Sequence, residues 1–553
     1  MKIIKQFAFF PCILLIAFLS LLPVRGQAQS ADFKALQSLD IYHSILRELS
    51  LFYVDSIQID KLVETSINAM FEDLDPYTVY MPEEESEDFS ILTTGRYGGV
   101  GSLIKKVPEG IEISEPYQGF PIDKAGLVAG DIILSIDGES TAAMDATVAS
   151  KKMKGIVGTT VKFKILKLRT RETIDIELVR EQIHLSDITY SGMMQDGVGY
   201  IHLGSFTING SRDFRNAFLA LKKTGQLKKL IIDLRSNGGG PVEDAVNVVG
   251  CFVPRGTIVV SARGRTKGFD VTYRTKEEPL DVDIPIAVLV NNASASSSEI
   301  VAGALQDLDR AVVLGTRTFG KGLVQTSRSL GYNAQLKITT MRYYTPSGRC
   351  VQAIDYSHRN EDGSVGYVPD SLIQEFYTKN GRKVYDGGGI MPDVLMESES
   401  YSKLAYNILI RDLFRDYSVL YYAEHESIPE PEEFTLSDED YEAFIHFMTD
   451  KRFDDKTNSE LLLEHLIVAM KEEQLDETAA IEITALQQKV NHDRESKLRQ
   501  YKDELKPLIE NEIANRYYYQ AGRLRSILRR DKLLDKSIEV LNNTEEYHKL
   551  LEV

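Results

Sequence analysis

The stretch NNASASSSEIVAGALQDLDRAVVLGTRTFGKGLVQ, residues 291–325, carries the strongest signal in this chain of 553 residues. It follows an unbroken apolar run, residues 284–290, and such runs are typical of strands buried on both faces. Apolar residues at helical spacing come next, and Ser296 with Glu299 forms a capping-box pair at the start of that helix. A second short apolar run spans residues 311–314. The pattern predicts a strand–helix–strand unit with parallel strands and a right-handed crossover.

Polar and glycine-rich segments follow the predicted strands. NNASASSS comes after the first strand and GTRTFGKG after the second, while a third loop, residues 237–240, ends the apolar segment LKKLIIDLRSNGGG. In sheets of this kind, ligands bind outside the carboxyl ends of the strands. We therefore expect the serine-rich helix start, the lysine-bearing loop and the glycine loop to meet at one edge of the sheet.

Composition excludes several classes of protein. The length predicts several domains, and 43% hydrophobic residues suffice for packed cores. A formal charge of −18 lacks the basic footprint of a nucleic-acid binder, so we expect no nucleic-acid partner. Beyond the first 28 residues only Cys251 and Cys350 remain, which indicates neither a disulfide framework nor a zinc site. We expect no metal and no cofactor.

The first 28 residues have the pattern of a cleaved signal peptide. Lys2 and Lys5 precede an apolar core, residues 7–22, and small residues surround the end of the segment at Ala28. We expect the mature protein to be periplasmic or otherwise exported. The alternative is an uncleaved segment that would keep the protein near a membrane, although the core is short for a membrane span.

The remaining chain predicts a multidomain α/β and α+β protein. We expect a helical N-terminal region (31–85), a small β-rich domain (86–180), an α/β core with the strand–helix–strand unit (181–398) and a helical C-terminal domain (399–553). The charged C-terminal region is interpreted as a solvated helical domain or a dimerisation arm. Residues 352–386 form a polar insertion to which the sequence assigns no chemistry.

The β-rich region resembles a PDZ domain. The residues that carry the resemblance lie in segments 98–101, 125–127, 130–133 and 136–138. The resemblance implies that the backbone around Gly99, Val100 and Gly101 binds the terminal carboxylate of a peptide, which adds to the neighbouring strand edge. Ser102 stands where an apolar residue would be more usual, and this puts the shape of the peptide pocket in doubt.

The chemistry of the opening stretch favours a serine nucleophile with a lysine base. A serine hydroxyl needs a neighbouring base, and the histidines of this chain lie outside the glycine loops. A lysine can act as the base if burial lowers its pKa from about 10.4. Phe319, Leu323 and the flanking glycines suggest a dry loop around Lys321, and Gln325 lies where it can orient the amine. Taken singly, Ser296 is more simply a helix cap and Lys321 a solvated lysine; their joint position at one sheet edge favours the chemical interpretation.

The same residues resemble the S41 family of serine peptidases, the tail-specific or carboxy-terminal processing proteases. SASSSEIVAGALQD is similar to the family's nucleophile segment and GTRTFGKGLVQ to its lysine segment, and the resemblance runs from about residue 54 to 394. It implies Ser296 as nucleophile, Lys321 as general base and Gln325 as supporting residue. It also implies an oxyanion hole built from the backbone of Ser297 and of Gly238 or Gly239. A proline is common in the family at the position of Gly238, so the choice between the two glycines stays open.

The sequence thus predicts a serine endopeptidase that binds protein C-termini through its PDZ domain and cleaves them with a Ser/Lys dyad. The expected partners are proteins or peptides with accessible C-termini, and the family resemblance implies a homodimer. Two rivals remain: a peptide-binding scaffold built on an inactive protease fold, and another Ser/Lys acyl-transfer enzyme such as an amidase. The PDZ-like module favours protein tails over small amides.

Overall fold

A computed structural model describes residues 31–83, 91, 94–266, 268–397, 400–454, 456–475, 478–490 and 493–552. The predicted signal peptide lies outside these residues. Within the described part of the chain, no helix is both long enough and apolar enough to cross a membrane.

The first of two compact units ends at Tyr80 and is helical, as predicted. It consists of α2 (Ala31–Phe52) and α3 (Ile59–Glu72), and the short strand β1 (Val79–Met81) begins near its end. The hydroxyl groups of Tyr42 and Ser66 join the two helices by a hydrogen bond of 2.5 Å. Many large apolar side chains of α2 remain exposed.

The second unit, residues 81–553, begins with the β-rich domain. Its antiparallel sheet has the order β3-β4-β5-β7-β8, and β6 pairs with β5. The strands are β3 (Ser102–Val107), β4 (Gly110–Pro116), β5 (Ile132–Ile136), β6 (Glu139–Ser140), β7 (Thr160–Leu166) and β8 (Thr173–Val179). The domain also contains two short helices, α5 (Pro121–Lys124) and α6 (Ala146–Met153), and α6 lies beside the edge strand β3. A two-stranded ribbon, β2 (Arg96–Gly99) with β9 (Glu181–His184), flanks the domain.

The α/β core contains the predicted strand–helix–strand unit. Its sheet has the order β10-β11-β12-β15-β16-β23, with β10 antiparallel and the other strands parallel. The strands are β10 (Ile188–Met193), β11 (Val198–Leu203), β12 (Lys229–Asp233), β15 (Ile286–Val290), β16 (Val312–Gly315) and β23 (Val394–Leu395). All five residues of β15 are buried, which confirms a strand covered on both faces.

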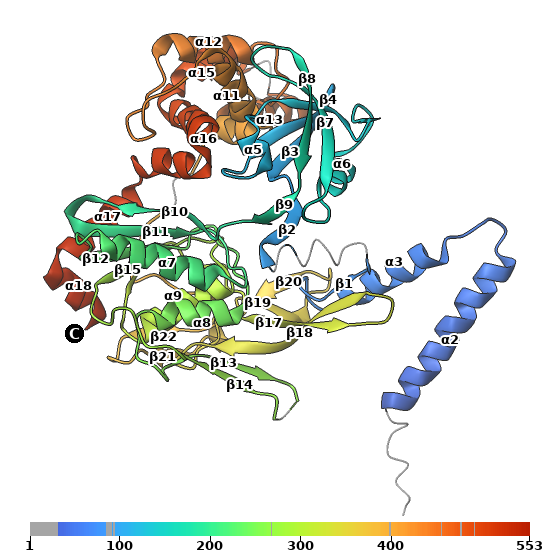
Figure 1. Cartoon of the computed structure of the whole chain (residues 1–553), viewed down its shortest axis with the longest axis vertical. Helices are drawn as coiled ribbons and strands as arrows, with labels where there is room; N and C mark the ends of the chain where they lie inside the picture. The colour runs from blue at the N-terminus through green and yellow to red at the C-terminus, as the bar shows by residue number, and fades with distance from the viewer. Residues whose placement is uncertain are drawn as a thin grey trace, which may run out of the picture. The chain divides into compact units, whose positions relative to one another are not determined.

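Helices from distant parts of the chain cover the two faces of this sheet (Figure 1). One face packs against α7 (Gly210–Lys223), α8 (Val242–Gly250) and α9 (Ser297–Asp307). The other face packs against the last two helices of the chain, α17 (Lys532–Asn542) and α18 (Thr544–Leu551). The end of the sequence is therefore one layer of the core.

A second antiparallel sheet and two hairpins complete the core. The sheet contains β13 (Ile258–Gly264), β14 (Val271–Arg274), β17 (Leu323–Ser329) and β18 (Gln335–Tyr344). The polar insertion forms the hairpins β19 (Ile354–Arg359) with β20 (Val365–Tyr367) and β21 (Glu375–Tyr377) with β22 (Lys383–Tyr385).

The C-terminal region is helical, as predicted, and has a core of its own. Before α17 it contains α10 (Lys403–Leu409), α11 (Leu413–Glu424), α12 (Asp438–Met448), α13 (Asn458–Glu472), α14 (Ala480–Val490), α15 (Arg494–Gln500) and α16 (Lys502–Leu528). It contacts the β-rich domain, because Arg516 donates to the carbonyl of Ser114 at 2.8 Å and Arg415 pairs with Glu112. The domain boundaries drawn from the sequence stay predictions.

Candidate active site

Ser296 lies in the turn that joins β15 to α9. Its φ of +56° and ψ of −114° place a residue with a side chain in a conformation that only glycine adopts readily. The backbone then enters the helix at once, since Ile300 N–H donates to Ser296 O at 2.9 Å. Such strain persists only where surrounding contacts hold it, and it is common at functional sites.

The neighbouring serines have structural partners. The hydroxyl groups of Ser294, Ser297 and Ser298 donate to the carbonyl oxygens of Leu234, Gly240 and Asn237, at 2.8, 2.7 and 2.9 Å. All three serines are fully buried, whereas Ser296 is partly exposed. Access therefore favours Ser296 over its neighbours as the reacting residue.

Glu299 is a buried carboxylate that connects the serine turn to the lysine loop. Its Oε2 accepts the backbone N–H groups of Ser296, at 2.9 Å, and of Lys321, at 2.8 Å. Its Oε1 accepts Thr318 Oγ1 at 2.6 Å and Gly320 N–H at 2.7 Å. Burial raises the pKa of Glu299, and these donors oppose the rise. The sequence marked Glu299 only as half of a capping box, a pattern that says nothing about the distant lysine loop.

The lysine loop is clamped by the segment that leads into the insertion. Ala353 N–H donates to Gly320 O at 2.9 Å, and Gly322 N–H donates to Gln352 Oε1 at 2.8 Å. A Cβ on Gly320 would come within 2.4 Å of the Ala353 Cβ, and the φ of +85° also requires glycine there. Phe319 is 44% exposed, and the expectation that it helps to enclose Lys321 stays a prediction.

Gln325 lies in β17, next to a bulge between Val324 and Gln325. Its side-chain amide donates to Thr339 Oγ1 on β18 at 3.1 Å. Gln325 thus lies on β17, the strand that follows the lysine loop, and Thr339 orients its side chain.

The glycine loop after β12 packs directly on the serine turn. Gly239 has a φ of +92°, and a Cβ there would lie 2.7 Å from both Ala295 O and Ser296 Cβ. The Gly239 N–H donates to Asn237 Oδ1 at 2.9 Å. The N–H groups of Gly238 and Ser297 donate to no residue that the structure describes. Backbone donors for an oxyanion are therefore available beside Ser296.

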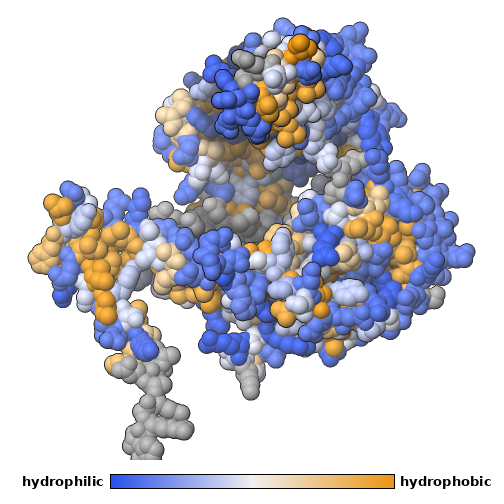
Figure 2. All heavy atoms as spheres, turned by 180° about the vertical axis from the view of Figure 1, so that it is seen from behind, coloured by the Kyte–Doolittle hydropathy of each residue, from blue (hydrophilic) through white to orange (hydrophobic). Residues whose placement is uncertain are grey.

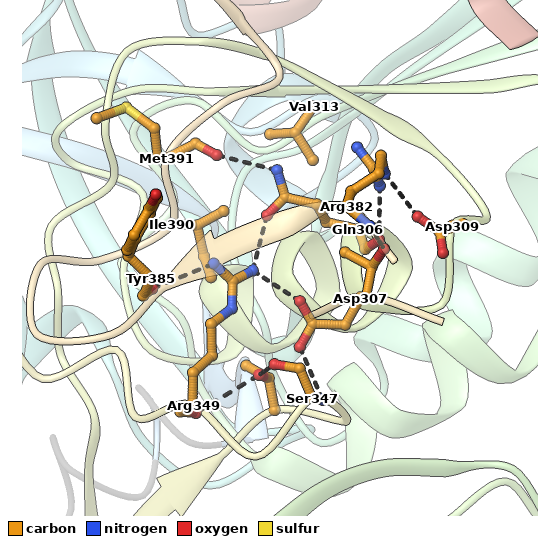
Figure 3. Close-up of polar contacts among 12 residues, drawn as sticks. Gln306, Asp307, Asp309, Val313, Ser347, Arg349, Arg382, Tyr385, Ile390 and Met391 are labelled. Atoms are coloured by element: carbon orange, nitrogen blue, oxygen red, sulfur yellow. Dashed lines mark hydrogen bonds and ion pairs between the residues drawn. The ribbon is translucent and has the colours of Figure 1, made fainter. Parts of the chain in front are cut away.

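The far end of α9 is held by a buried polar network (Figure 3). Arg349, 1% exposed, donates to Gln306 Oε1 at 2.7 Å and to Asp307 Oδ1 at 2.8 Å. Arg382, from the insertion, donates to Gln306 O at 2.8 Å and pairs with Asp309 at 2.6 Å. Both ends of the helix that follows Ser296 are thus fixed by charged groups.

The loop before β3, residues 99–101, is the predicted carboxylate-binding loop. Gly101 has a φ of +81°, and Val100 is 2% exposed. The carbonyls of Val100 and Gly101 accept N–H groups from Ile122 and Tyr117 at 3.0 and 2.9 Å. The N–H groups of Val100 and Gly101 donate to no described residue, while Gly99 is paired in β2.

Ser102 follows this loop, and its hydroxyl is buried. Among the described residues it has no hydrogen-bond partner. A polar group therefore stands where the resemblance leads one to expect an apolar wall.

Comparison with known proteins gives three profile matches along the chain. The profile of peptidase family S41 matches residues 197–359, that of the PDZ domain matches residues 90–166, and that of a probable PDZ-protease C-terminal helical domain matches residues 404–541. Together they cover the three parts of the second unit.

The similar proteins found by comparison are named as proteases. The carboxy-terminal-processing protease of Bartonella bacilliformis is 36% identical over 337 residues, which are 60% of this chain and 74% of that protein. A probable CtpA-like serine protease of Staphylococcus aureus is 32% identical over 317 residues, 57% of this chain and 62% of that protein. Among solved structures, a photosystem II D1 C-terminal processing protease is 26% identical over 64% of this chain and 86% of that chain, with a TM-score of 0.34. The chain therefore belongs to peptidase family S41 and is a serine-type peptidase of the carboxy-terminal-processing group with a PDZ domain and a helical C-terminal domain.

Proposed function

We propose that this protein is an exported endopeptidase that binds the C-terminal tails of proteins and cleaves them with Ser296 and Lys321. The observation that carries the proposal is the Glu299 carboxylate, which holds the backbones of both residues on one oxygen atom. Ser296 and Lys321 lie 25 residues apart in sequence, and this shared contact brings their backbones together at the sheet edge.

The proposed reaction is an acyl transfer. Ser296 Oγ attacks the scissile carbonyl carbon while Lys321 Nζ, neutral when it acts, takes the hydroxyl proton. The resulting oxyanion is bound by the Ser297 N–H and by the N–H of Gly238 or Gly239. Lys321 returns the proton to the leaving amine, and water then hydrolyses the acyl-enzyme by the reverse proton path. Gln325 orients Lys321 from the start of β17.

The proposed tail site is the groove between β3 and α6. A peptide would add as a strand to the free edge of β3, and its terminal carboxylate would bind the N–H groups of the loop formed by Gly99, Val100 and Gly101. The edge position of β3 and the unengaged N–H groups of Val100 and Gly101 support this assignment.

A pairwise assembly through the N-terminal unit is also proposed. Hydrophobic side chains gather on the surface of α2 (Figure 2), and Leu36, Leu39, Leu51 and Phe52 are each more than 60% exposed. A surface of this kind marks an interface with another protein or with a membrane. A second copy of the chain is the proposed occupant; light scattering of Leu36→Glu/Leu39→Glu and flotation with lipid vesicles distinguish it from a membrane surface.

The test of the function uses a folded protein with an added apolar, unstructured C-terminal tail. Wild-type protein should shorten the tail, and Ser296→Ala and Lys321→Ala should each lower kcat by about 10⁴-fold or more. A rise of kcat with pH whose midpoint lies well below that of free lysine supports Lys321 as the base. Cleavage that survives Ser296→Ala would show that Ser296 is not the nucleophile.

The same experiment separates the rival functions. Tight binding of the tail without cleavage by the wild-type protein favours a peptide-binding scaffold. Hydrolysis of small amides by the wild-type protein, with no cleavage of the added tail, favours an amidase.

A further inference from the structure

Arg235, which lies two residues before the glycine loop 237–240, is held by a carboxylate from the far end of the chain. Arg235 Nη2 donates to Asp233 Oδ2 and to Asp531 Oδ2, each at 2.6 Å. The Asp233 side chain is 1% exposed, that of Asp531 is 7% exposed and that of Arg235 is 22% exposed. A guanidinium between two largely buried carboxylates is fixed in position, because charge-assisted hydrogen bonds are stronger than neutral ones.

Asp233 is itself part of the sheet. It is the last residue of β12, and it accepts the hydroxyl of Tyr200 at 2.7 Å and the backbone N–H of Arg235 at 2.9 Å. Asp233 and Asp531 therefore hold the Arg235 side chain from the strand on one side and from the C-terminal layer on the other.

The chain after Arg235 leads at once into the site. Ser236 has a φ of +60°, and its N–H donates to Asn291 Oδ1 at 2.9 Å. Asn237 is fully buried, donates to Leu203 O at 2.7 Å and accepts Ala295 N–H at 3.0 Å. Gly239, four residues after Arg235, packs on Ser296. A displacement of Arg235 would therefore be passed along the loop to the serine turn.

The Asp531 side chain also caps a helix, through its other carboxylate oxygen. Its Oδ1 accepts the N–H groups of Leu533 and Leu534, at 2.9 and 3.1 Å, and so caps α17. One side chain thus joins the start of the C-terminal layer to the start of the glycine loop, across 296 positions of sequence.

We infer that Asp531 is a positioning residue of the active site, which acts through Arg235 to hold residues 236–240 against Ser296. This inference rests on the proposed role of that loop as the oxyanion site. It assigns part of the active-site geometry to the C-terminal layer, which lies outside the segment matched by the S41 profile.

The test uses Asp531→Asn in the full-length protein. Asparagine caps a helix as well as aspartate does, so α17 keeps its cap. The side-chain amide removes the negative charge and turns a donor toward Arg235. Because a displacement on the order of 1 Å near the reacting atoms costs about 10²-fold, we expect kcat for tail cleavage to fall by about tenfold or more, with KM within about twofold.

Hydrogen exchange gives a readout that does not depend on cleavage. We expect the amides of residues 234–240 to exchange about tenfold faster in Asp531→Asn than in the wild type. If the wild-type protein cleaves no tail, the proposed function fails, while this exchange measurement still tests the positioning role.

The matched control is Asp535→Asn, the same change at an exposed residue in the first turn of α17. It should leave kcat, Tm and loop exchange at wild-type values. Arg235→Gln combined with Asp531→Asn should lower kcat no further than Arg235→Gln alone, because both changes break one contact. The inference is overturned if Asp531→Asn has the kcat and the loop exchange of the wild type. It is also overturned if kcat falls only in proportion to a loss of Tm.

Discussion

Ser296 combines a strained backbone with the first turn of a helix. A φ of +56° is unfavourable for a residue with a side chain. The hydrogen bond from Ser296 N–H to the Glu299 carboxylate offsets part of this conformational cost. The same carboxylate accepts the Lys321 N–H, so one buried anion shapes both sides of the proposed dyad. A capping residue and a reacting residue are compatible here, because in the capping box the Ser296 oxygen acts as an acceptor and its O–H proton is not used by the cap.

Glu299→Gln tests this role at the residue scale. The amide keeps the shape of the side chain, but its NH₂ group faces two of the four donors, which then lose their acceptor. Each unsatisfied buried donor costs about 1–3 kcal/mol. We expect tail cleavage to fall by about 10²-fold or more and Tm to fall measurably, with the exposed Glu109→Gln as control. Activity within twofold of wild type would contradict the role of Glu299.

Gly238→Pro decides which glycine supplies the oxyanion donor. Nothing lies within 4 Å of a Cβ at Gly238, and proline has no N–H, so the change removes one donor with little steric effect. Since Gly239 packs directly on Ser296, we expect cleavage to survive within about tenfold, which assigns the donor to Gly239. That result also requires the Gly239 N–H to leave Asn237 when a substrate binds. A loss of about 10²–10³-fold would assign the donor to Gly238 instead.

At the scale of elements, α9 is positioned by its two ends. Its first turn is held by Glu299, and its last residues are held by the Arg349 and Arg382 network (Figure 3). The insertion therefore has a structural role, since Arg382 and Lys379, which lie between β21 and β22, bond to the carbonyl oxygens of Gln306 and Asp307 at the end of α9. Its polar composition reflects these buried pairs and its exposed hairpin surfaces.

Arg349→Met should destabilise the core strongly. The change leaves the buried Asp307 without its ion-pair partner, and breaking one side of a buried pair costs about 3–5 kcal/mol. Urea unfolding should show this loss, while the exposed Arg328→Met should change the free energy of unfolding by less than about 0.5 kcal/mol. A loss below about 1 kcal/mol for Arg349→Met would show that the network adds little.

At the scale of the whole molecule, the helices near the C-terminus form one layer of the α/β core. α17 and α18 bury the second face of the parallel sheet, with Leu534, Ile538, Leu541 and Leu551 packed against strands from the middle of the sequence. Before that, α16 contacts the β-rich domain through Arg516. The helical domain is therefore bonded both to the PDZ domain and, through the helices that follow it, to the protease sheet.

Tyr547→Phe tests the contribution of the last helix. The Tyr547 hydroxyl donates to Ile286 O at 3.1 Å and accepts Ile286 N–H at 2.9 Å, at the start of the strand that leads to Ser296. Without it, a buried N–H loses its partner, and we expect the free energy of unfolding to fall by about 1–3 kcal/mol in urea titrations. Tyr332→Phe, at a residue 99% exposed, should have no effect, and equal stability of the two variants would contradict the assignment.

The sequence alone determined the classes of the domains, the strand–helix–strand unit and the candidate residues Ser296, Lys321 and Gln325. These features depend on short-range patterns: hydrophobic period, glycine clusters and capping pairs within a few residues. Tertiary structure alone decided the contacts that link distant segments, such as Glu299 with the lysine loop, Arg349 with the end of α9 and Asp531 with Arg235. Hydrogen bonds of this kind leave no periodic trace in the sequence, because each depends on how the sheet order brings separate loops to one edge.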